Sequence, residues 1–224
     1  MSTHNLAKVY SAELEGVDAR LIEVEVDLNV GLHAFNIVGL ADKALNEARE
    51  RVNSALKNSG VKPPNRENRR ITINLAPADV KKSGSQYDLA LALGYLAATE
   101  QIAPFDTKNK IFVGELALDG RVRPIGGALS IAEMAHRLNI EELYLPEENA
   151  REASVLKNVK IIPVSTLQSL ILHLENKNRI EPTLFREEFT ERISTIDFSE
   201  IKGQESAKRA LTIAAGGGHN VLSI

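Results

Sequence analysis

The segment of this sequence with the clearest chemical potential is a loop that leads into a helix. Lys82, Gly84 and Ser85 precede Asp88, where an apolar helix is expected to begin. A lysine, a hydroxyl and a helix N-terminus could together activate a nucleophile or hold an anion. The alternative is an ordinary loop-to-helix junction in which the charge of Asp88 favours the helix dipole. The residues of this stretch alone favour the junction, because helix starts of this composition are common.

A second distinctive stretch runs from Gly114 to Gly127. Its pattern predicts a strand, a tight turn at Asp119 and Gly120, a second strand, and a helix that begins after Gly126 and Gly127. Turns alone explain its glycines and its proline. This stretch therefore predicts structure more directly than it predicts chemistry.

A third candidate is a loop rich in basic residues, which could contact a phosphate backbone. Its members are Lys57, Lys62, Arg66, Arg69 and Arg70, and Lys81 and Lys82 could join them. The alternative is a solvated surface loop. We favour that alternative, because the chain has a net charge of −3 and residues 57–70 contain no aromatic side chain to stack on bases.

The composition excludes several other classes of site. With 43% hydrophobic and 25% charged residues, the chain has an ordinary soluble globular composition. It has no cysteine, which excludes disulfides, thiolate catalysis and cysteine-based metal sites. Its five histidines form no HxxxH or HExxH pair, so no metal site is expected. We see no apolar run of the ~20 residues that a bilayer requires and no signal peptide, and we expect a cytoplasmic protein without a membrane partner.

The elements that must position these residues follow from hydrophobic periodicity. Ile22, Val24, Val26 and Leu28 alternate with acidic residues, which indicates a half-buried antiparallel strand. The pattern predicts strands at 8–14, 22–28, 34–38, 71–75, 111–115, 142–145 and 160–163. It predicts helices at 41–56, 88–100, 126–138, 147–156 and 166–174. Together these indicate an α/β (α+β) fold, a mixed sheet with helices packed on it.

The character of the chain changes at about Glu175. Residues 176–195 are charged and poorly periodic, so we interpret them as a linker. Residues 196–224 form a different segment, with a helix expected from Gly203 to Ala215 and an apolar strand from Asn220 to Ile224. The predicted organisation is thus 1–175, a linker at 176–195, and 196–224.

Several long motifs in order carry a family resemblance. KKSGSQYDLALAL, GELALDGRVRPIGGALSIAEMA and LYLPEENAREA resemble the nucleophile segment of Lon-type proteolytic domains and the segments that follow it. FNIVGLADKALNEARERVNSALKNSG, ITINLAPADVKKSGSQYDLALALGYLAA and IKGQESAKRALTIAAGGGHN resemble the ComM/YifB family of magnesium-chelatase-related AAA+ proteins, over essentially the whole chain. The resemblance implies a Lon-like domain at 1–175, related to the second domain of ribosomal small-subunit protein five.

The departures from the Lon pattern are as informative as the match. Lon-type enzymes use a lysine as base for a serine nucleophile, and this alignment places Gln86 at the nucleophile position and Ile131 at the base position. An amide cannot serve as that nucleophile, and isoleucine cannot accept a proton. The resemblance therefore implies a degenerate domain with no catalytic residues. The alternative is a Ser-Lys peptidase in which Ser85 is a displaced nucleophile and Lys82 its base.

The same resemblance gives residues 196–224 a role as the N-terminal fragment of an AAA+ ATPase module. It implies that Ile201, Gly203 and Gln204 lie beside the adenine in the full-length protein. It also implies that the strand from Val221 leads into a Walker A loop, which is not among these residues. The glycines at 216–218 do not replace that loop, since they lack its lysine. We expect no cofactor in this chain, and ATP with magnesium in the full-length protein.

The hypothesis drawn from the resemblance is a non-enzymatic accessory domain of an ATP-driven hexameric motor. Members of the ComM group act on branched DNA in competence and recombination, as branch-migration helicases. The domain would then support self-association of a ring, or engage DNA through Lys62, Arg66, Arg69 and Arg70. Besides the Ser-Lys peptidase, the other alternative is a magnesium-chelatase-like subunit that inserts magnesium into a porphyrin, which only the family's name suggests.

Overall fold

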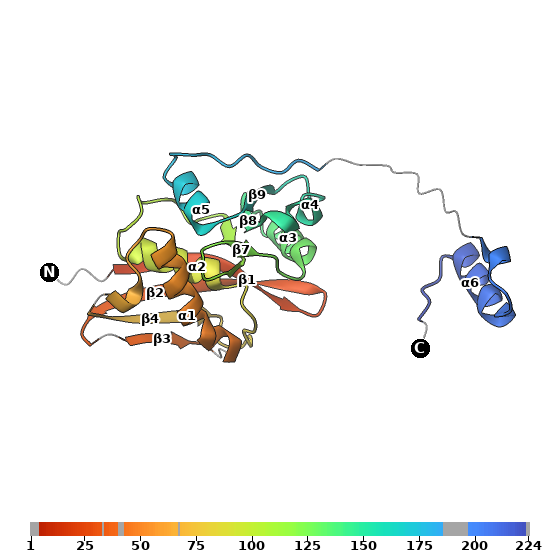
Figure 1. Ribbon diagram of the computed structural model, residues 1–224, viewed down its shortest axis with the longest axis horizontal. Coiled ribbons are helices and arrows are strands. Elements are labelled where there is room, and N and C mark those ends of the chain that lie inside the picture. Colours follow the sequence, from red (N-terminus) through yellow and green to blue (C-terminus); the bar gives the residue numbers. More distant parts are fainter. Residues whose placement is uncertain (1–4, 33, 40–42, 67, 186–196, 223–224) are drawn as a thin grey trace. The chain divides into compact units, whose positions relative to one another are not determined.

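The structure is a computed structural model that describes residues 5–32, 34–39, 43–66, 68–185 and 197–222 (Figure 1). The chain divides into two compact units, Met1–Phe185 and Arg186–Ile224. The first unit is of mixed α/β class, as expected. Among the described residues, no helix is long and apolar enough to cross a bilayer.

A four-stranded sheet forms one part of the first unit. Strands β1 (Asn5–Glu15) and β2 (Asp18–Val30) form a long antiparallel hairpin. Strand β4 (Arg69–Ala76) pairs antiparallel with β2, and β3 (Ala34–Val38) pairs parallel with β4. The strand order is therefore β1-β2-β4-β3. The alternating pattern of β2 turns its apolar residues toward the core, as its period of two predicts.

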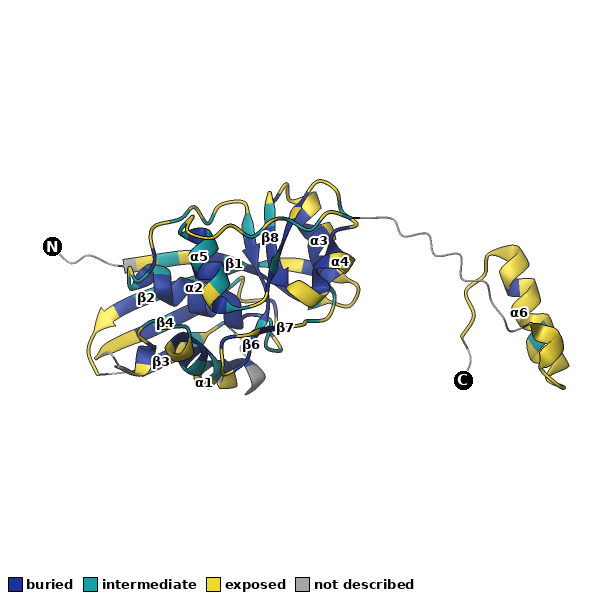
Figure 2. Ribbon diagram, turned by 45° about the horizontal axis from the view of Figure 1, so that its top comes forward, coloured by how far each residue is buried: buried dark blue, intermediate teal, exposed yellow. Residues whose placement is uncertain are grey.

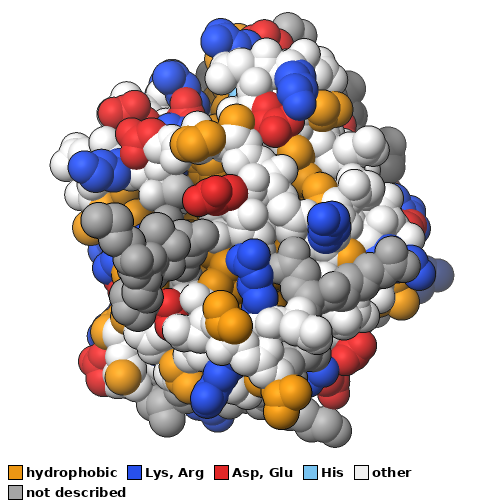
Figure 3. Space-filling model, turned by 90° about the vertical axis from the view of Figure 1, so that its left-hand side faces the viewer, with side chains coloured by type: hydrophobic (Ala, Val, Ile, Leu, Met, Phe, Trp, Pro, Cys, Tyr) orange, Lys and Arg blue, Asp and Glu red, His pale blue; other side chains and the backbone are white. Residues whose placement is uncertain are grey.

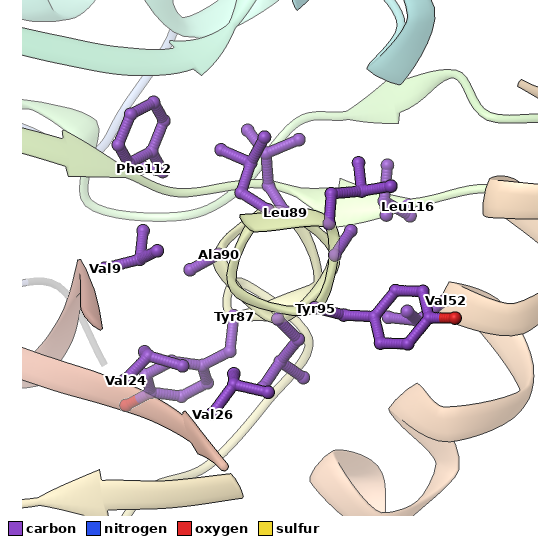
Figure 4. Packing of buried hydrophobic residues seen from close by; sticks show 14 of the residues in the cluster. Val9, Val24, Val26, Val52, Tyr87, Leu89, Ala90, Tyr95, Phe112 and Leu116 are labelled. Carbon is purple, nitrogen blue, oxygen red and sulfur yellow. The ribbon is translucent and has the colours of Figure 1, made fainter. Parts of the chain in front are cut away.

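Two helices cover the inner face of this sheet. Helix α1 (Lys43–Asn58) and helix α2 (Asp88–Ala98) pack against each other, and α2 also packs on β1 and β2. Apolar side chains from the sheet, from α1 and from the segment after α2 surround α2, which is itself buried along nearly its whole length (Figure 4). Gly94 lets the helix approach the sheet, because a Cβ there would lie 2.7 Å from the side chain of Val26.

A three-stranded parallel sheet forms the other part. Its order is β5 (Lys110–Phe112), β8 (Glu142–Pro146) and β9 (Lys160–Val164). Three helices accompany it: α3 (Ala128–Arg137), α4 (Ala150–Ala153) and α5 (Leu167–Leu174). The unit also contains two short 3-10 turns, η1 (Pro64–Arg66) and η2 (Glu147–Asn149). A small hairpin, β6 (Glu115–Leu116) and β7 (Val122–Arg123), stands between the two parts.

The four-stranded sheet is mixed, as expected, but the described strands are divided among three sheets, and two elements differ in length from the expectation. The strand expected at 111–115 is broken at Gly114, whose amide donates 2.8 Å to the Gln86 carbonyl, so β5 and β6 belong to different sheets. The helix expected at 147–156 is only η2 followed by α4. It ends where the Ser154 hydroxyl donates to the Arg151 carbonyl.

Residues 176–185, which we expected to belong to the linker, lie against the first unit. The amide of Thr183 donates 2.8 Å to the carbonyl of Ile161 on β9, and Ile180 packs against the main core cluster. We call residues 176–185 the strap. The rest of the expected linker, 186–195, lies outside the described residues.

The second unit contains a 3-10 turn, η3 (Phe198–Glu200), and helix α6 (Glu205–Gly217), which Gly218 caps in the left-handed conformation. Among its described residues only Ala214 is buried, and α6 is exposed over nearly its whole surface in Figure 2. Residues 220–222 are not a strand, contrary to expectation, and Ser223 and Ile224 lie outside the described residues.

Candidate functional site

A buried carboxylate organises the loop that first suggested chemistry. Glu13 is only 3% exposed, and its Oε2 accepts hydrogen bonds from the Ser83 amide and from Nε2 of Gln86, both at 3.1 Å. Its Oε1 accepts from the Ser83 hydroxyl at 3.1 Å, and the Tyr87 hydroxyl also donates to Oε2. We call these four residues the Glu13 cluster. Its donors are neutral, and their hydrogen bonds to Glu13 hold the loop against β1.

Sequence reasoning missed Glu13, although a signal was present. Val9, Ser11 and Glu13 alternate along β1, and Val9 belongs to the apolar core. A carboxylate in such an inward-facing row must find hydrogen-bond donors, because an unpaired buried charge is costly. The partners themselves could not be predicted, since they lie about seventy residues further along the chain.

The two positions of the Lon dyad have different surroundings. Gln86 is hydrogen-bonded to Glu13 at the end of β1. Ile131 on α3 is 1% exposed, within a core cluster to which Ala12 and Leu14 contribute. Neighbouring side chains of a strand point to opposite faces. The side chain of Glu13 therefore lies on one face of β1, and those of Ala12 and Leu14 lie on the other. Gln86 is thus fixed by a carboxylate, whereas Ile131 is core.

Lys82 and Ser85, the alternative pair, are directed to different partners. Lys82 is fully buried, and its ammonium donates to the Pro77 carbonyl. Burial lowers the pKa of Lys82, which would suit a base. The Ser85 hydroxyl, however, donates to the Glu115 carboxylate, to which Arg123 also donates at 3.2 Å. The described hydrogen bonds therefore do not join the two residues.

Asp88 makes a connection that the sequence did not suggest. It is fully buried and receives a bidentate pair from Arg51, with Nε at 2.6 Å and Nη2 at 3.0 Å. It also accepts from the Leu116 amide at 3.1 Å, so it ties α1, α2 and β6 together and does not cap its own helix. Burial raises the pKa of Asp88 to about 6, and the hydrogen bond from Arg51 opposes that rise.

The structure divides the predicted basic residues. Lys57, Lys62, Arg69, Arg70 and Lys81 are exposed. Buried Lys82 cannot join them on the surface. The side chain of Arg66 lies outside the described part of the structure.

Two arginines of this set stand next to exposed aliphatic side chains at one end of the four-stranded sheet. Arg69 pairs with Val30 across the β2–β4 ladder, and Arg70 pairs with Asn29. Val30 is 100% exposed and Leu32, just after β2, is 93% exposed. We call Val30, Leu32, Arg69 and Arg70 the sheet end. It combines positive charge with apolar surface.

In the second unit, the residues expected beside an adenine are all exposed. Gly203 and Gln204 adopt left-handed backbone conformations immediately before α6, and the Ile201 carbonyl accepts a hydrogen bond from Lys208 at 3.1 Å. Within the described residues of the chain, no group of three or more His, Asp or Glu side chains is placed to hold a metal ion.

Comparison with known proteins places the chain in a family. The family described as subunit ChlI of Mg-chelatase matches residues 24–149, and a second one, described as magnesium chelatase, subunit ChlI, matches residues 197–224. The chain belongs to the ComM/YifB family of magnesium-chelatase-related proteins. The resemblance to this family, expected from the motifs, is confirmed.

The curated relatives show how much of the family's architecture is present. Competence protein ComM of Haemophilus influenzae is 40% identical over 222 residues, which cover 97% of this chain and 43% of that protein. Uncharacterized protein YifB of Escherichia coli is 38% identical over 223 residues, 98% of this chain and 42% of that protein. The chain therefore spans about two fifths of these ComM/YifB relatives. A Lon protease of Rhizobium meliloti is 32% identical over 166 residues, 70% of this chain and 20% of the protease.

Proposed function

We propose that this chain is a non-catalytic part of an AAA+ motor resembling ComM, and that its first unit engages DNA. Membership in the ComM/YifB family and the match of residues 197–224 to magnesium chelatase support the motor assignment. The full-length protein would use ATP and magnesium and act as a hexameric ring in competence or recombination. The partial identity to a Lon protease supports a Lon-like fold for the first unit.

The Glu13 cluster supports the non-catalytic role. Gln86 aligns with the nucleophile position, and its amide is held by the Glu13 carboxylate, which also accepts hydrogen bonds from Ser83 and Tyr87. Ile131 is buried among apolar side chains, where a charged lysine would be costly. A peptidase assay on the intact chain tests this role. Hydrolysis that disappears in Ser85→Ala would establish the Ser-Lys alternative instead.

The observation that carries the DNA role is the sheet end. Arginine supplies phosphate contacts, and exposed aliphatic side chains can pack on the terminal bases of a strand junction. Figure 3 views the side on which β2 ends and β4 begins in Figure 1, and on this face basic and hydrophobic side chains are interspersed with acidic ones. The open face of the same sheet carries Glu23, Glu25 and Asp27 along β2, which would repel phosphates. Contact would therefore be confined to the end of the sheet.

The experiment is a fluorescence-anisotropy titration at low salt with forked, single-stranded and duplex DNA. We expect binding in the micromolar range, and we expect the double variant Arg69→Ala/Arg70→Ala to weaken it and to reduce the salt slope by about 2. Arg121→Ala/Arg137→Ala is the matched control, because both arginines are exposed but lie on other elements. If no DNA binds at low salt, the DNA role is excluded and ring assembly, measured by sedimentation of the full-length protein, becomes the assignment.

A further inference from the structure

The strap lies along a cavity that is not lined by any residue of the Glu13 cluster. This cavity has a volume of about 570 Å³. The first residues of the three parallel strands, Lys110, Glu142 and Lys160, line it together with His173 of α5 and Ile180 of the strap. The three strand residues form a Lys-Glu-Lys row, with Nζ of Lys110 at 3.4 Å and Nζ of Lys160 at 3.9 Å from the Glu142 carboxylate.

A continuous series of hydrogen bonds joins this row to the strap. The Tyr144 hydroxyl donates to Glu142 at 2.7 Å and lies 3.3 Å from Nε2 of His173. On the other side of the ring, the amide of Ile180 donates to Nδ1 of His173 at 2.8 Å. Nδ1 must be unprotonated to accept that bond, so the ring proton lies on Nε2 and is directed at the Tyr144 oxygen. Every donor in the series thus has an acceptor.

We propose that His173 is a proton-operated latch that holds the strap on the first unit. When Nδ1 takes up a proton from water, the ring gains a second donor and loses its only acceptor. The Ile180 amide then faces another N–H group, and its hydrogen bond is lost. Release of the strap lengthens the connection that leads toward the second unit, and so changes the reach of that connection.

The first residues of the strap are also held to α5, because the amides of Asn176, Lys177 and Asn178 donate to the carbonyls of His173 and Leu172. The contacts beyond Asn178 are fewer. Thr183 makes one backbone bond to β9, the edge strand of its sheet, and Ile180 is only partly buried against the core. The exposed Arg179 bonds within its own turn, to Asn176 at 3.3 Å. Of these contacts, the one with His173 alone depends on the protonation state of a side chain.

The surroundings of His173 set the direction of its titration. Burial lowers its pKa, the charge of Glu142 raises it, and the charges of Arg179 and Lys110 lower it again, so the pKa lies below its usual value. The other charged groups at the cavity are Lys160, Asp106 and Glu181. The latch is therefore closed at neutral pH and opens as the solution is acidified below the ordinary range of histidine.

The test is amide hydrogen exchange of Ile180 and Thr183 in the intact chain, measured by NMR at pH 7.5 and pH 5.0 and normalised to intrinsic rates. We expect the protection of both amides to fall about tenfold or more between these pH values, as for loss of a net hydrogen bond and local opening. Unchanged protection of Ile180 would overturn the proposal.

Two substitutions of His173 distinguish the loss of the hydrogen-bond acceptor Nδ1 from its protonation. His173→Asn keeps an acceptor near the place of Nδ1 but cannot be protonated there, so both amides should stay protected at both pH values. His173→Phe keeps a ring beside Tyr144 without an acceptor, so they should exchange rapidly at both. His136→Gln, an exposed histidine on α3, should behave like the wild type. A pH response that persists in His173→Asn, or wild-type protection in His173→Phe, would contradict the latch.

Discussion

Two carboxylates in the first unit, one buried and one half-buried, each accept a hydrogen bond from a tyrosine, but the rest of their hydrogen-bond networks differ. Glu13 on β1 accepts a hydrogen bond from Tyr87, and Glu142 on β8 accepts one from Tyr144. Around Glu13 the other donors, from Ser83 and Gln86, are neutral and do not titrate near pH 7. Around Glu142 the network continues through Tyr144 to His173, a titratable group whose pKa burial lowers.

The two networks differ in their other members, because neutral donors from Ser83 and Gln86 complete the one around Glu13, whereas a histidine extends the one around Glu142. Burial would raise the pKa of Glu142, but the hydrogen bond from Tyr144 and the charges of Lys110 and Lys160 together lower it. Glu142 therefore stays ionised while His173 changes its charge. The hydrogen bonds to Glu13 connect the loop at 83–87 to β1.

The largest expected effect comes from removing the Glu13 carboxylate. Glu13→Ala removes the common acceptor of the hydrogen bonds from Ser83, Gln86 and Tyr87, and it should lower the free energy of unfolding of the first unit by about 3 kcal/mol. Tyrosine fluorescence during urea denaturation measures this, because all four tyrosines lie in the first unit and the chain has no tryptophan.

The matched control for that change is Glu142→Ala. Glu142 retains partial exposure, with 20% of its side chain accessible, and the lysines it leaves can turn to water. The loss should be about 1 kcal/mol. Equal losses at Glu13 and Glu142 would mean that the two networks do not differ in the way the hydrogen bonds indicate.

A subtler test removes only the tyrosine hydroxyls. Tyr87→Phe should cost about 1.5 kcal/mol, because Tyr87 is fully buried and donates to a carboxylate. Tyr144→Phe should cost about 0.5–1 kcal/mol, since Lys110 and Lys160 remain beside Glu142. Urea denaturation of the two variants gives both values, and a larger loss for Tyr144→Phe would reverse the comparison.

Most of the local structure was accessible from the sequence. The strand at Ala34–Val38 is found as predicted, and the alternation at 22–28 and the helical spacing at 41–56 gave elements of the correct type. Such patterns predict well because the spacing of apolar residues reflects which face of a helix or strand is buried. Gly114 was one of the exceptions, because its tertiary hydrogen bond to Gln86 breaks the expected strand.

The parts that could not be predicted depend on contacts between distant segments. The charged, poorly periodic strap has the composition of a linker, yet it is held by backbone amides and one histidine, which leave no periodic signal. The pairing of Asp88 with Arg51 joins helices far apart in the sequence. The resemblance supplied the positions of Gln86 and Ile131, but only the structure shows that a carboxylate fixes one and a core cluster encloses the other.

The smallest expected effect is a difference in pH dependence between the wild type and His173→Asn. Because the folded pKa of His173 is depressed, the unfolded chain takes up its proton first as the pH falls. The stability contributed by the neutral ring is therefore complete above about pH 6.5 and is lost as the pH falls below that value.

Asp88, whose pKa is raised to about 6, acts in the opposite sense, since its folded form takes up a proton before the unfolded chain does. Asp88 is present in both proteins and cancels in the difference, so the wild type should lose more stability than His173→Asn between pH 7 and pH 5. Urea denaturation at a series of pH values measures this, and parallel pH profiles for the two proteins would show that His173 titrates alike in the folded and unfolded states.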